Sequence, residues 1–292
     1  MRCKLLLSTI LLVSIVSTLR AQTSSGPQKG TLILTGGGFG KGVIERFVTS
    51  AGGPDSNFVY IPTASSGIKL ESGFIYIPPD TDTPAANTHQ FEQELCKMFG
   101  VKRITVLHTR NRETANSESF VAPLKKANGV WFSEGNAGRL ASAYLDTLTQ
   151  HELEAFLNRD GIIGGNSAGS IIQGSYTVRG RADKPLLMAK GHERGFGFMK
   201  NVAINPHLTE EKRDAELVNV IDAYPELLGI GIDEKAAILV QGDRFEVMGE
   251  GRVAIYDNKK HGGDWYYWLS PGDKFDLRSR TRQVAAKPIT QK

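Results

Sequence analysis

The sequence predicts an α/β protein with a mostly parallel sheet, helices on both faces of that sheet and an antiparallel edge near the C-terminus. Short apolar runs alternate with segments that carry apolar residues at helical spacing. Such alternation implies parallel strands joined by right-handed crossovers. After residue 236 the apolar runs follow one another closely, which is typical of antiparallel hairpins.

The first half of the chain contains four predicted strands. The run at 31–35 stops at three glycines, which is typical of a strand that ends in a turn. A loop rich in Gly, Pro, Asp and Thr is expected from Pro62 to about Asn87. The predicted strands are 31–35, 57–61, 103–107 and 129–132, and the predicted helices are 41–50 and 90–99.

The second half continues the alternation around a glycine-rich turn. The strand at 161–163 runs directly into Gly164–Gly169, and a helix is expected from Ser170 onward. Gly242 and Asp243 form a hairpin turn between two of the later strands. The other predicted helices are 137–146, 149–159 and 214–224, and the later strands are 202–204, 228–232, 237–241, 245–248 and 253–256.

The composition is that of an ordinary globular protein. Of 292 residues, 40% are hydrophobic and 23% are charged, which excludes a disordered tail, a collagen-like repeat and a disulfide-rich miniprotein. The formal charge is +4, and Arg2, Lys4 and Arg20 in the first segment contribute three of the positive charges. Because the remainder is close to neutral, we expect no nucleic-acid partner.

The first 21 residues resemble a secretory signal peptide. Arg2 and Lys4 precede the apolar run from Leu5 to Val16, and Ala21 ends a cleavage site. The run is shorter than the roughly 20 apolar residues of a membrane-spanning helix. We therefore expect residues 1–21 to be removed and residues 22–292 to form one α/β domain, exported to the periplasm or the extracellular space and not membrane-bound. Its one cysteine, Cys96, excludes an internal disulfide.

Ser167 carries the strongest chemical signal. Residues Gly165-Asn166-Ser167-Ala168-Gly169 match the Gly-x-Ser-x-Gly pattern, in which a sharp turn between a strand and a helix exposes a nucleophilic serine. The alternative is a glycine-rich turn that binds phosphate. A P-loop, however, would need Lys before the Ser or Thr. We therefore expect Ser167 to be a nucleophile.

A nucleophilic serine needs a base, and the chain has six histidines: His89, His108, His151, His192, His207 and His261. His207 and His108 each follow a predicted strand, whereas the others lie in polar segments. Asp233 and Glu234, at the end of strand 228–232, are the candidate acids. The histidines show no metal-ligand spacing.

Five motifs together resemble the cyanophycinases and their relatives in peptidase family S51, which also includes aspartyl dipeptidases. They are Leu34-Thr-Gly-Gly-Gly38, Tyr60-Ile-Pro-Thr-Ala-Ser65, Phe132-Ser-Glu-Gly-Asn136 with Arg139-Leu140, Gly164-Gly-Asn-Ser-Ala-Gly169 and Gly231-Ile-Asp-Glu234. The resemblance extends from about residue 29 to residue 282. It implies a flavodoxin-like three-layer sandwich, similar to the class I glutamine amidotransferases.

The resemblance also implies the site residues. The family order of Ser, His and Glu falls on Ser167, His207 and Glu234, with Asp233 as the rival acid. Two backbone N–H groups, of Ala168 and Gly135, would stabilise the oxyanion. The implied partner is a peptide or small amide substrate, and the reaction needs no cofactor and no metal. Relatives are often homodimers, but the sequence leaves the oligomeric state open.

The chain departs from the family where substrate is bound. Glu134-Gly135-Asn136-Ala137 replaces Gly-Gly-Asp-Gln, Asn205-Pro206-His207 replaces Asp-Gln-His, and the arginines expected after the histidine match only loosely. Candidate substrate-binding residues are Glu134, Asn136, Asn205 and Arg213. Glu134 either receives a cationic group or is an ordinary solvated acid, and the sequence slightly favours the second.

The sequence therefore predicts a secreted serine-type exopeptidase or amidase acting on aspartyl peptide bonds, with the β-Asp-Arg polymer as one candidate substrate. Two alternatives stay open. An α/β-hydrolase-type esterase would use His261 with Asp233, because its histidine follows the acid in the chain. A non-catalytic binding protein would keep the fold and leave Ser167 unreactive.

Overall fold

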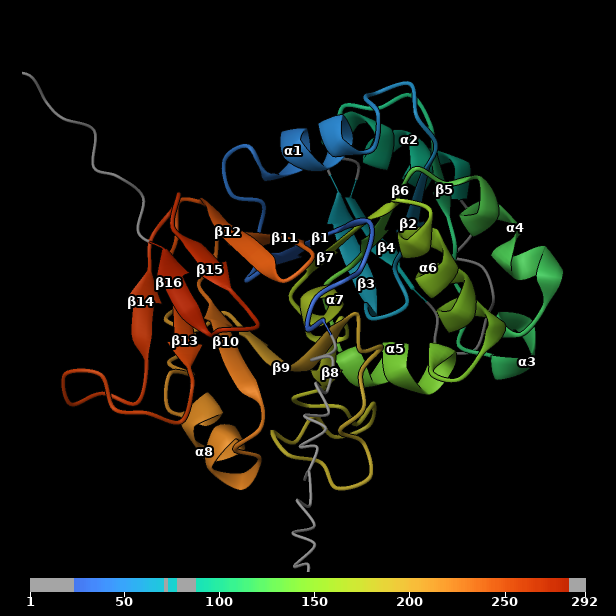
Figure 1. Cartoon of the computed structure of the whole chain (residues 1–292). Helices are drawn as coiled ribbons and strands as arrows, with labels where there is room; N and C mark the ends of the chain where they lie inside the picture. Colours follow the sequence, from blue (N-terminus) through green and yellow to red (C-terminus); the bar gives the residue numbers. More distant parts are fainter. Residues whose placement is uncertain (1–23, 71–72, 78–87, 284–292) are drawn as a thin grey trace, which may run out of the picture.

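The computed structural model describes residues 24–70, 73–77 and 88–283 (Figure 1). The predicted signal peptide and residues 78–87 of the predicted loop lie outside these ranges. A nine-stranded sheet crosses the molecule. Its spatial order is β16 (Thr281–Gln283), β15 (Lys274–Asp276), β12 (Arg244–Gly249), β11 (Ala236–Gln241), β1 (Thr31–Thr35), β7 (Ile162–Asn166), β6 (Gly129–Phe132), β2 (Phe58–Ile61) and β5 (Ile104–Val106).

The pairing in this sheet changes at β1. Strands β1, β7, β6, β2 and β5 are parallel neighbours, whereas β11, β12, β15 and β16 add antiparallel pairs to the other side of β1. The predicted α/β class, with a parallel sheet and an antiparallel C-terminal edge, is confirmed.

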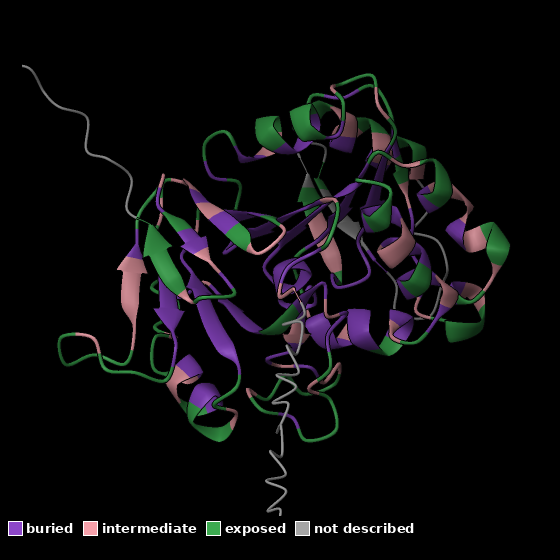
Figure 2. Cartoon of the chain, in the orientation of Figure 1, coloured by how far each residue is buried: buried purple, intermediate pink, exposed green. Residues whose placement is uncertain are grey.

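Helices cover both faces of the sheet. Helices α1 (Val43–Ser50) and α2 (Thr88–Phe99) pack on one face, and α4 (Glu118–Lys126), α5 (Ala137–Tyr144) and α6 (Leu148–Asn158) pack on the other. Alternate residues of β1 point to opposite faces. Ile33 therefore packs with α1 and α2, while Leu32 and Leu34 pack with α4 to α6. Figure 2 shows the buried strands between exposed helix surfaces.

A second, five-stranded sheet packs beside the first, and the sequence pattern did not indicate it. Its order is β14 (Tyr267–Leu269), β13 (Val253–Tyr256), β10 (Leu228–Ile232), β9 (Met199–Pro206) and β8 (Gly174–Tyr176). Strands β8, β9 and β10 are parallel, and α8 (Glu216–Ala223) packs against β10. The chain passes from the second sheet back to the first after β10, because β11 pairs with β1; β10 and β12 therefore belong to different sheets.

Several local elements differ from those predicted. A hairpin of β3 (Gly67–Leu70) and β4 (Gly73–Tyr76) lies within the segment expected to be loop. The helix expected from Ser170 is a single turn, α7 (Ala168–Ile171), because the chain must turn into β8. Helices α3 (Arg112–Ala115) and α4 occupy a segment for which we predicted no element.

Caps explain these last two helices. The side chain of Asn111 accepts hydrogen bonds from the backbone N–H groups of Glu113 and Thr114, and the Ser117 hydroxyl accepts one from Phe120. Asn and Ser are preferred N-cap residues because they satisfy N–H groups that lack helical partners. No helix of the described residues is long and apolar enough to cross a membrane.

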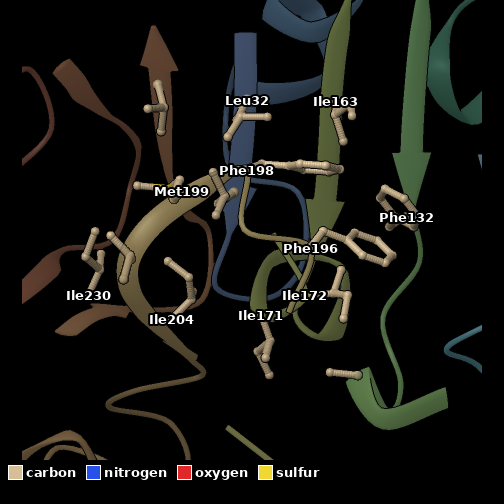
Figure 3. Close-up of a cluster of buried hydrophobic side chains, with 14 of the residues drawn as sticks. Leu32, Phe132, Ile163, Ile171, Ile172, Phe196, Phe198, Met199, Ile204 and Ile230 are labelled. Carbon is tan, nitrogen blue, oxygen red and sulfur yellow. The ribbon is translucent and has the colours of Figure 1, made fainter. Parts of the chain in front are cut away.

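A buried apolar cluster joins the two sheets (Figure 3). Leu32, Phe132 and Ile163 come from the nine-stranded sheet, and Met199, Ile204 and Ile230 come from the second sheet. Between these two groups lie Ile171, Ile172, Phe196 and Phe198. Close packing resists displacement, so this cluster fixes the end of β7 relative to the ends of β9 and β10.

Candidate active site

Ser167 directly follows β7 and adopts a strained backbone conformation. Its φ is 50° and its ψ is −105°, values that a non-glycine residue rarely adopts. A Cβ added to Gly165 would lie 2.3 Å from the carbonyl oxygen of Gly169, and one added to Gly169 would lie 2.6 Å from that of Phe132. The turn is therefore so tight that glycine is required on both sides of the serine.

His207 lies between Ser167 and Glu234. Its Nε2 is 2.9 Å from Ser167 Oγ, and its Nδ1 is 2.9 Å from Glu234 Oε1. The three residues come from the ends of β7, β9 and β10, so two sheets contribute to one site. The His207 side chain is 16% exposed and that of Glu234 is 43% exposed.

The glycine loop after β1 organises these residues. The backbone N–H of His207 donates to the Gly36 carbonyl at 2.9 Å, and that of Lys235 donates to the Gly37 carbonyl at 2.8 Å. A Cβ on Gly37 would lie 2.4 Å from His207 Cε1 and 3.0 Å from Glu234 Cγ. The histidine and the glutamate therefore approach each other across a position that has no room for a side chain.

Asp233, the rival acid, has different partners. Its buried carboxylate accepts hydrogen bonds from the Thr209 hydroxyl at 2.6 Å, the Thr209 N–H at 3.2 Å and the Arg252 N–H at 3.4 Å. The two adjacent acids therefore have different roles: Glu234 contacts the imidazole of His207, and Asp233 holds the segment that follows His207 through its hydrogen bonds to Thr209.

The alternative histidine, His261, is also placed elsewhere. Its Nε2 lies 2.8 Å from Asp257 Oδ1, and its ring packs against Tyr267. His108, which also follows a strand, is buried with its Nδ1 2.9 Å from the Thr63 hydroxyl. The structure brings neither histidine to Ser167, and the combination of His261 with Asp233 is not formed.

A cavity of about 540 Å³ opens in front of Ser167. Gly135 lines it in a conformation with a φ of 135°, and a Cβ there would lie 2.3 Å from the Ala64 carbonyl oxygen. Ala168 is fully buried at the first position of α7. The role of these two N–H groups as oxyanion donors stays a prediction. The lining comprises Ser65, Ser66, Glu134, Gly135, Asn136, Ala137, Arg139, Ser167, Ile171, Arg179, Pro185, His207, Glu211 and Arg213.

The four candidate substrate-binding residues are placed differently. Glu134, Asn136 and Arg213 line the cavity. Asn136 caps α5 through the Gly138 N–H and donates to the carbonyls of residues 181 and 182, so its polar atoms already have protein partners. Asn205 was expected to contact substrate, but it is fully buried and does not line the cavity. We correct its role to a supporting one.

Asn205 supports a cavity residue that the sequence analysis missed, Arg179. The side-chain oxygen Oδ1 of Asn205 accepts a hydrogen bond from Arg179 Nη1 at 2.9 Å, and the Glu216 carboxylate accepts hydrogen bonds from both Arg179 and Asn205 Nδ2. Arg213, paired with Glu211, lies nearby. Burial lowers the pKa of the Arg213 guanidinium, and the neighbouring Arg179 lowers it further. Arg179 lies outside every motif of the sequence, so no local signal marks it.

The described residues contain no group of three or more His, Cys, Asp or Glu side chains that could hold a metal ion. Ser167, His207 and Glu234, at the ends of strands from two sheets, have the spacing in which hydrolytic enzymes hold a nucleophile, a base and an orienting acid.

The chain belongs to peptidase family S51, whose family model matches residues 32–248. A cyanophycinase from Synechococcus elongatus is 27% identical over 285 residues, covering 89% of this chain and 83% of the relative. A cyanophycinase from Nostoc sp. is 26% identical over 272 residues, covering 86% and 85%. The crystal structure of a peptidase from an acI-B1 actinobacterium has the same fold, with a TM-score of 0.61 at 21% identity over 86% of this chain and 98% of that one.

Proposed function

We propose that this chain is a serine-type peptidase or amidase that hydrolyses aspartyl peptide bonds through an acyl-enzyme on Ser167. One observation carries the proposal: the two 2.9 Å contacts that join Ser167, His207 and Glu234 at the wall of the cavity. This geometry matches the roles of nucleophile, base and orienting acid.

In the proposed reaction, Glu234 accepts a hydrogen bond from His207 Nδ1–H, which leaves Nε2 free to accept a proton. Nε2 takes the Ser167 proton as Oγ bonds to the carbonyl carbon. The N–H groups of Ala168 and Gly135 stabilise the resulting oxyanion. His207 then gives the proton to the leaving amine as the C–N bond breaks. Water repeats the attack and frees Ser167, so the reaction needs no metal or cofactor.

The arginines on the cavity wall support an acidic substrate. Arg179 and Arg213 line the same cavity as Ser167. Each is already paired with a glutamate, but a guanidinium has five N–H donors and can also bind a substrate carboxylate through a charge-assisted hydrogen bond. An aspartyl residue carries a carboxylate close to its scissile carbonyl. The β-Asp-Arg polymer is one candidate, suggested by the names of the relatives. The changed residues around Gly135 and before His207 favour a different aspartyl peptide.

A substrate panel tests this proposal. Cyanophycin and α- and β-linked aspartyl dipeptides are assayed with the wild type and with Ser167→Ala, and a fluorophosphonate is used to label Ser167 for mass spectrometry. We expect hydrolysis of at least one aspartyl peptide, its loss in Ser167→Ala, and an adduct on Ser167. Full activity in Ser167→Ala, or an unlabelled Ser167 in folded protein, would refute the proposal.

The arginine contribution is tested separately. We expect Arg179→Gln to raise the KM for aspartyl peptides roughly 10- to 100-fold, the range for a charged hydrogen bond. Arg181→Gln is the matched control, because the Arg181 side chain pairs with Asp183 and does not line the cavity. Equal KM values in the two variants would show that Arg179 does not bind substrate.

We also propose that residues 1–21 direct export and that residues 22–292 act as one hydrolytic domain outside the cytoplasm. The apolar run and the cleavage pattern of the sequence support this proposal. Intact-mass measurement of the exported chain is expected to find Gln22 at its N-terminus. Light scattering on the same sample distinguishes a monomer from the homodimer that the family resemblance implies.

A further inference from the structure

The carboxylate of Glu134 is held on the cavity wall next to Ser167. Glu134 is the second residue after the end of β6 and precedes Gly135, a proposed oxyanion donor. Asn166, the residue before Ser167, donates from Nδ2 to Glu134 Oε2 at 3.2 Å. The other end of the Asn166 amide accepts from the Thr35 hydroxyl at 2.7 Å. The Thr35 contact fixes the orientation of the Asn166 side-chain amide, and the amide in turn holds the Glu134 carboxylate in place.

Glu134 has no ion-pair partner among the described residues; Arg139, which also lines the cavity, donates from Nη1 to the Ala64 carbonyl at 3.0 Å. None of the ion pairs among the described residues includes Glu134, whereas two other acids near the cavity, Glu211 and Glu216, are paired with Arg213 and Arg179. The cavity lining therefore combines three arginines, two of them paired with glutamates, with one carboxylate that has no ion-pair partner among the described residues.

An unneutralised carboxylate is unfavourable where an oxyanion develops. Glu134 itself is exposed to solvent, but a substrate bound in the cavity would displace water from it. Like charges then repel more strongly than in water, and the repulsion would raise the barrier to attack by Ser167. A cation beside Glu134 would remove this cost in the transition state. A substrate that binds with such a cation would therefore react faster than a neutral analogue.

We propose that Glu134 is a specificity-determining residue that receives a cationic group of the substrate. The substrate is then zwitterionic, with a carboxylate at Arg179 and Arg213 and a cation at Glu134. Two sources share this chemistry: the free α-ammonium of an N-terminal aspartyl residue and the guanidinium of a β-linked arginine. The inference rests on the proposed function and specifies its substrate class.

The experiment combines protein variants with matched substrates. Wild type, Glu134→Gln and Glu210→Gln are compared on an aspartyl dipeptide and its N-acetyl derivative, and on β-Asp-Arg and its citrulline analogue, which lacks the guanidinium charge. Glu210 is the matched control because it is exposed near His207 and does not line the cavity. An aspartate diphenyl phosphonate, with and without N-acetylation, gives a second readout that needs only the nucleophile: Ser167 Oγ bonds to phosphorus, and phenol leaves with the proton.

We expect the wild type and Glu210→Gln to prefer the cationic member of one substrate pair, and Glu134→Gln to lose this preference by roughly 10- to 100-fold. On neutral analogues Glu134→Gln should equal or exceed the wild type, which a loss of folding cannot produce. The pair that responds identifies the source of the cation. Glu134→Ser replaces Glu134→Gln in the same comparison if the glutamine variant does not fold.

Two results would overturn the inference: an unchanged preference in folded Glu134→Gln, or wild-type rates on the neutral analogues that equal those on the cationic peptides. Failure of the proposed function is distinguishable, because it leaves Ser167 unlabelled by the fluorophosphonate. If Ser167 is labelled and hydrolysis depends on Ser167, but Glu134→Gln has no effect, then the proposed function stands and only the role of Glu134 is refuted.

Discussion

Replacing Glu234 by Gln tests the most exposed of the three proposed catalytic residues, Ser167, His207 and Glu234. The substitution keeps the shape of the side chain but removes its charge and places an amide 2.9 Å from His207 Nδ1. A charge-assisted hydrogen bond contributes about 1.5–3 kcal/mol. Because the Glu234 side chain is 43% exposed, solvent screens its charge, and we take the lower part of this range. This loss alone predicts a roughly 10- to 30-fold slower reaction.

A second loss comes from the tautomer. The new glutamine amide can donate an N–H to His207 Nδ1, and this favours the tautomer of His207 that carries its proton on Nε2. In that tautomer Nε2 cannot accept the Ser167 proton. In a fully buried Ser-His-Asp set the corresponding change lowers kcat by roughly 10⁴. With partial exposure we expect Glu234→Gln to lower kcat about 100- to 1,000-fold, with unchanged folding.

The assay measures kcat at saturating substrate together with thermal unfolding of the same sample. Asp233→Asn is the control, because Asp233 is buried and bonded to Thr209 and Arg252 rather than to His207. We expect this variant to lose about 1–3 kcal/mol of unfolding free energy and to keep most of its activity while folded. A less than tenfold loss in Glu234→Gln, with a large loss in folded Asp233→Asn, would refute our assignment of the acid.

Two further predictions concern the glycine loop and the N-terminal contact. Gly37→Ala is expected to lower kcat on the order of 100-fold or more, because the new Cβ would lie 2.4 Å from His207 Cε1 and would displace the catalytic base. Gly38→Ala is the control: a Cβ there meets nothing within 4 Å, so this variant should keep its activity at a small cost in stability. Burial raises the pKa of Asp243, but hydrogen bonds from residues 24–26 and an ion pair outweigh this and lower it. Its contribution to stability is therefore present above the unfolded pKa of about 3.9 and is lost as the pH falls through the lower folded value. Thermal melts should show Asp243→Asn less stable than wild type at pH 7, with a difference that narrows below pH ~4; a constant difference would contradict this account.

Local sequence patterns predicted most strands of the fold. Apolar runs such as 228–232 and 253–256 match β10 and β13 in full, because the strand period is read from neighbouring residues. The helix expected after Ser170 was too long, and the second sheet was not predicted. The end of the helix and the second sheet both depend on contacts between residues that are distant in the sequence. Helix α7 ends early because the chain must continue into β8, which pairs with β9, and the spacing of apolar residues within a strand does not show which other strand it pairs with.

The candidate site shows the same division. The sequence by itself determined the strained serine turn, since Gly165 and Gly169 flank Ser167 in the chain, and it placed His207 and two acids at strand ends. Only the tertiary structure decided that Glu234 rather than Asp233 faces His207, that His261 is remote, that Asn205 supports Arg179, and that Glu134 lines the cavity with no ion-pair partner among the described residues. These facts depend on how β7, β9 and β10 are packed against one another. That packing is set by the apolar cluster between the two sheets, whose members are far apart in the sequence.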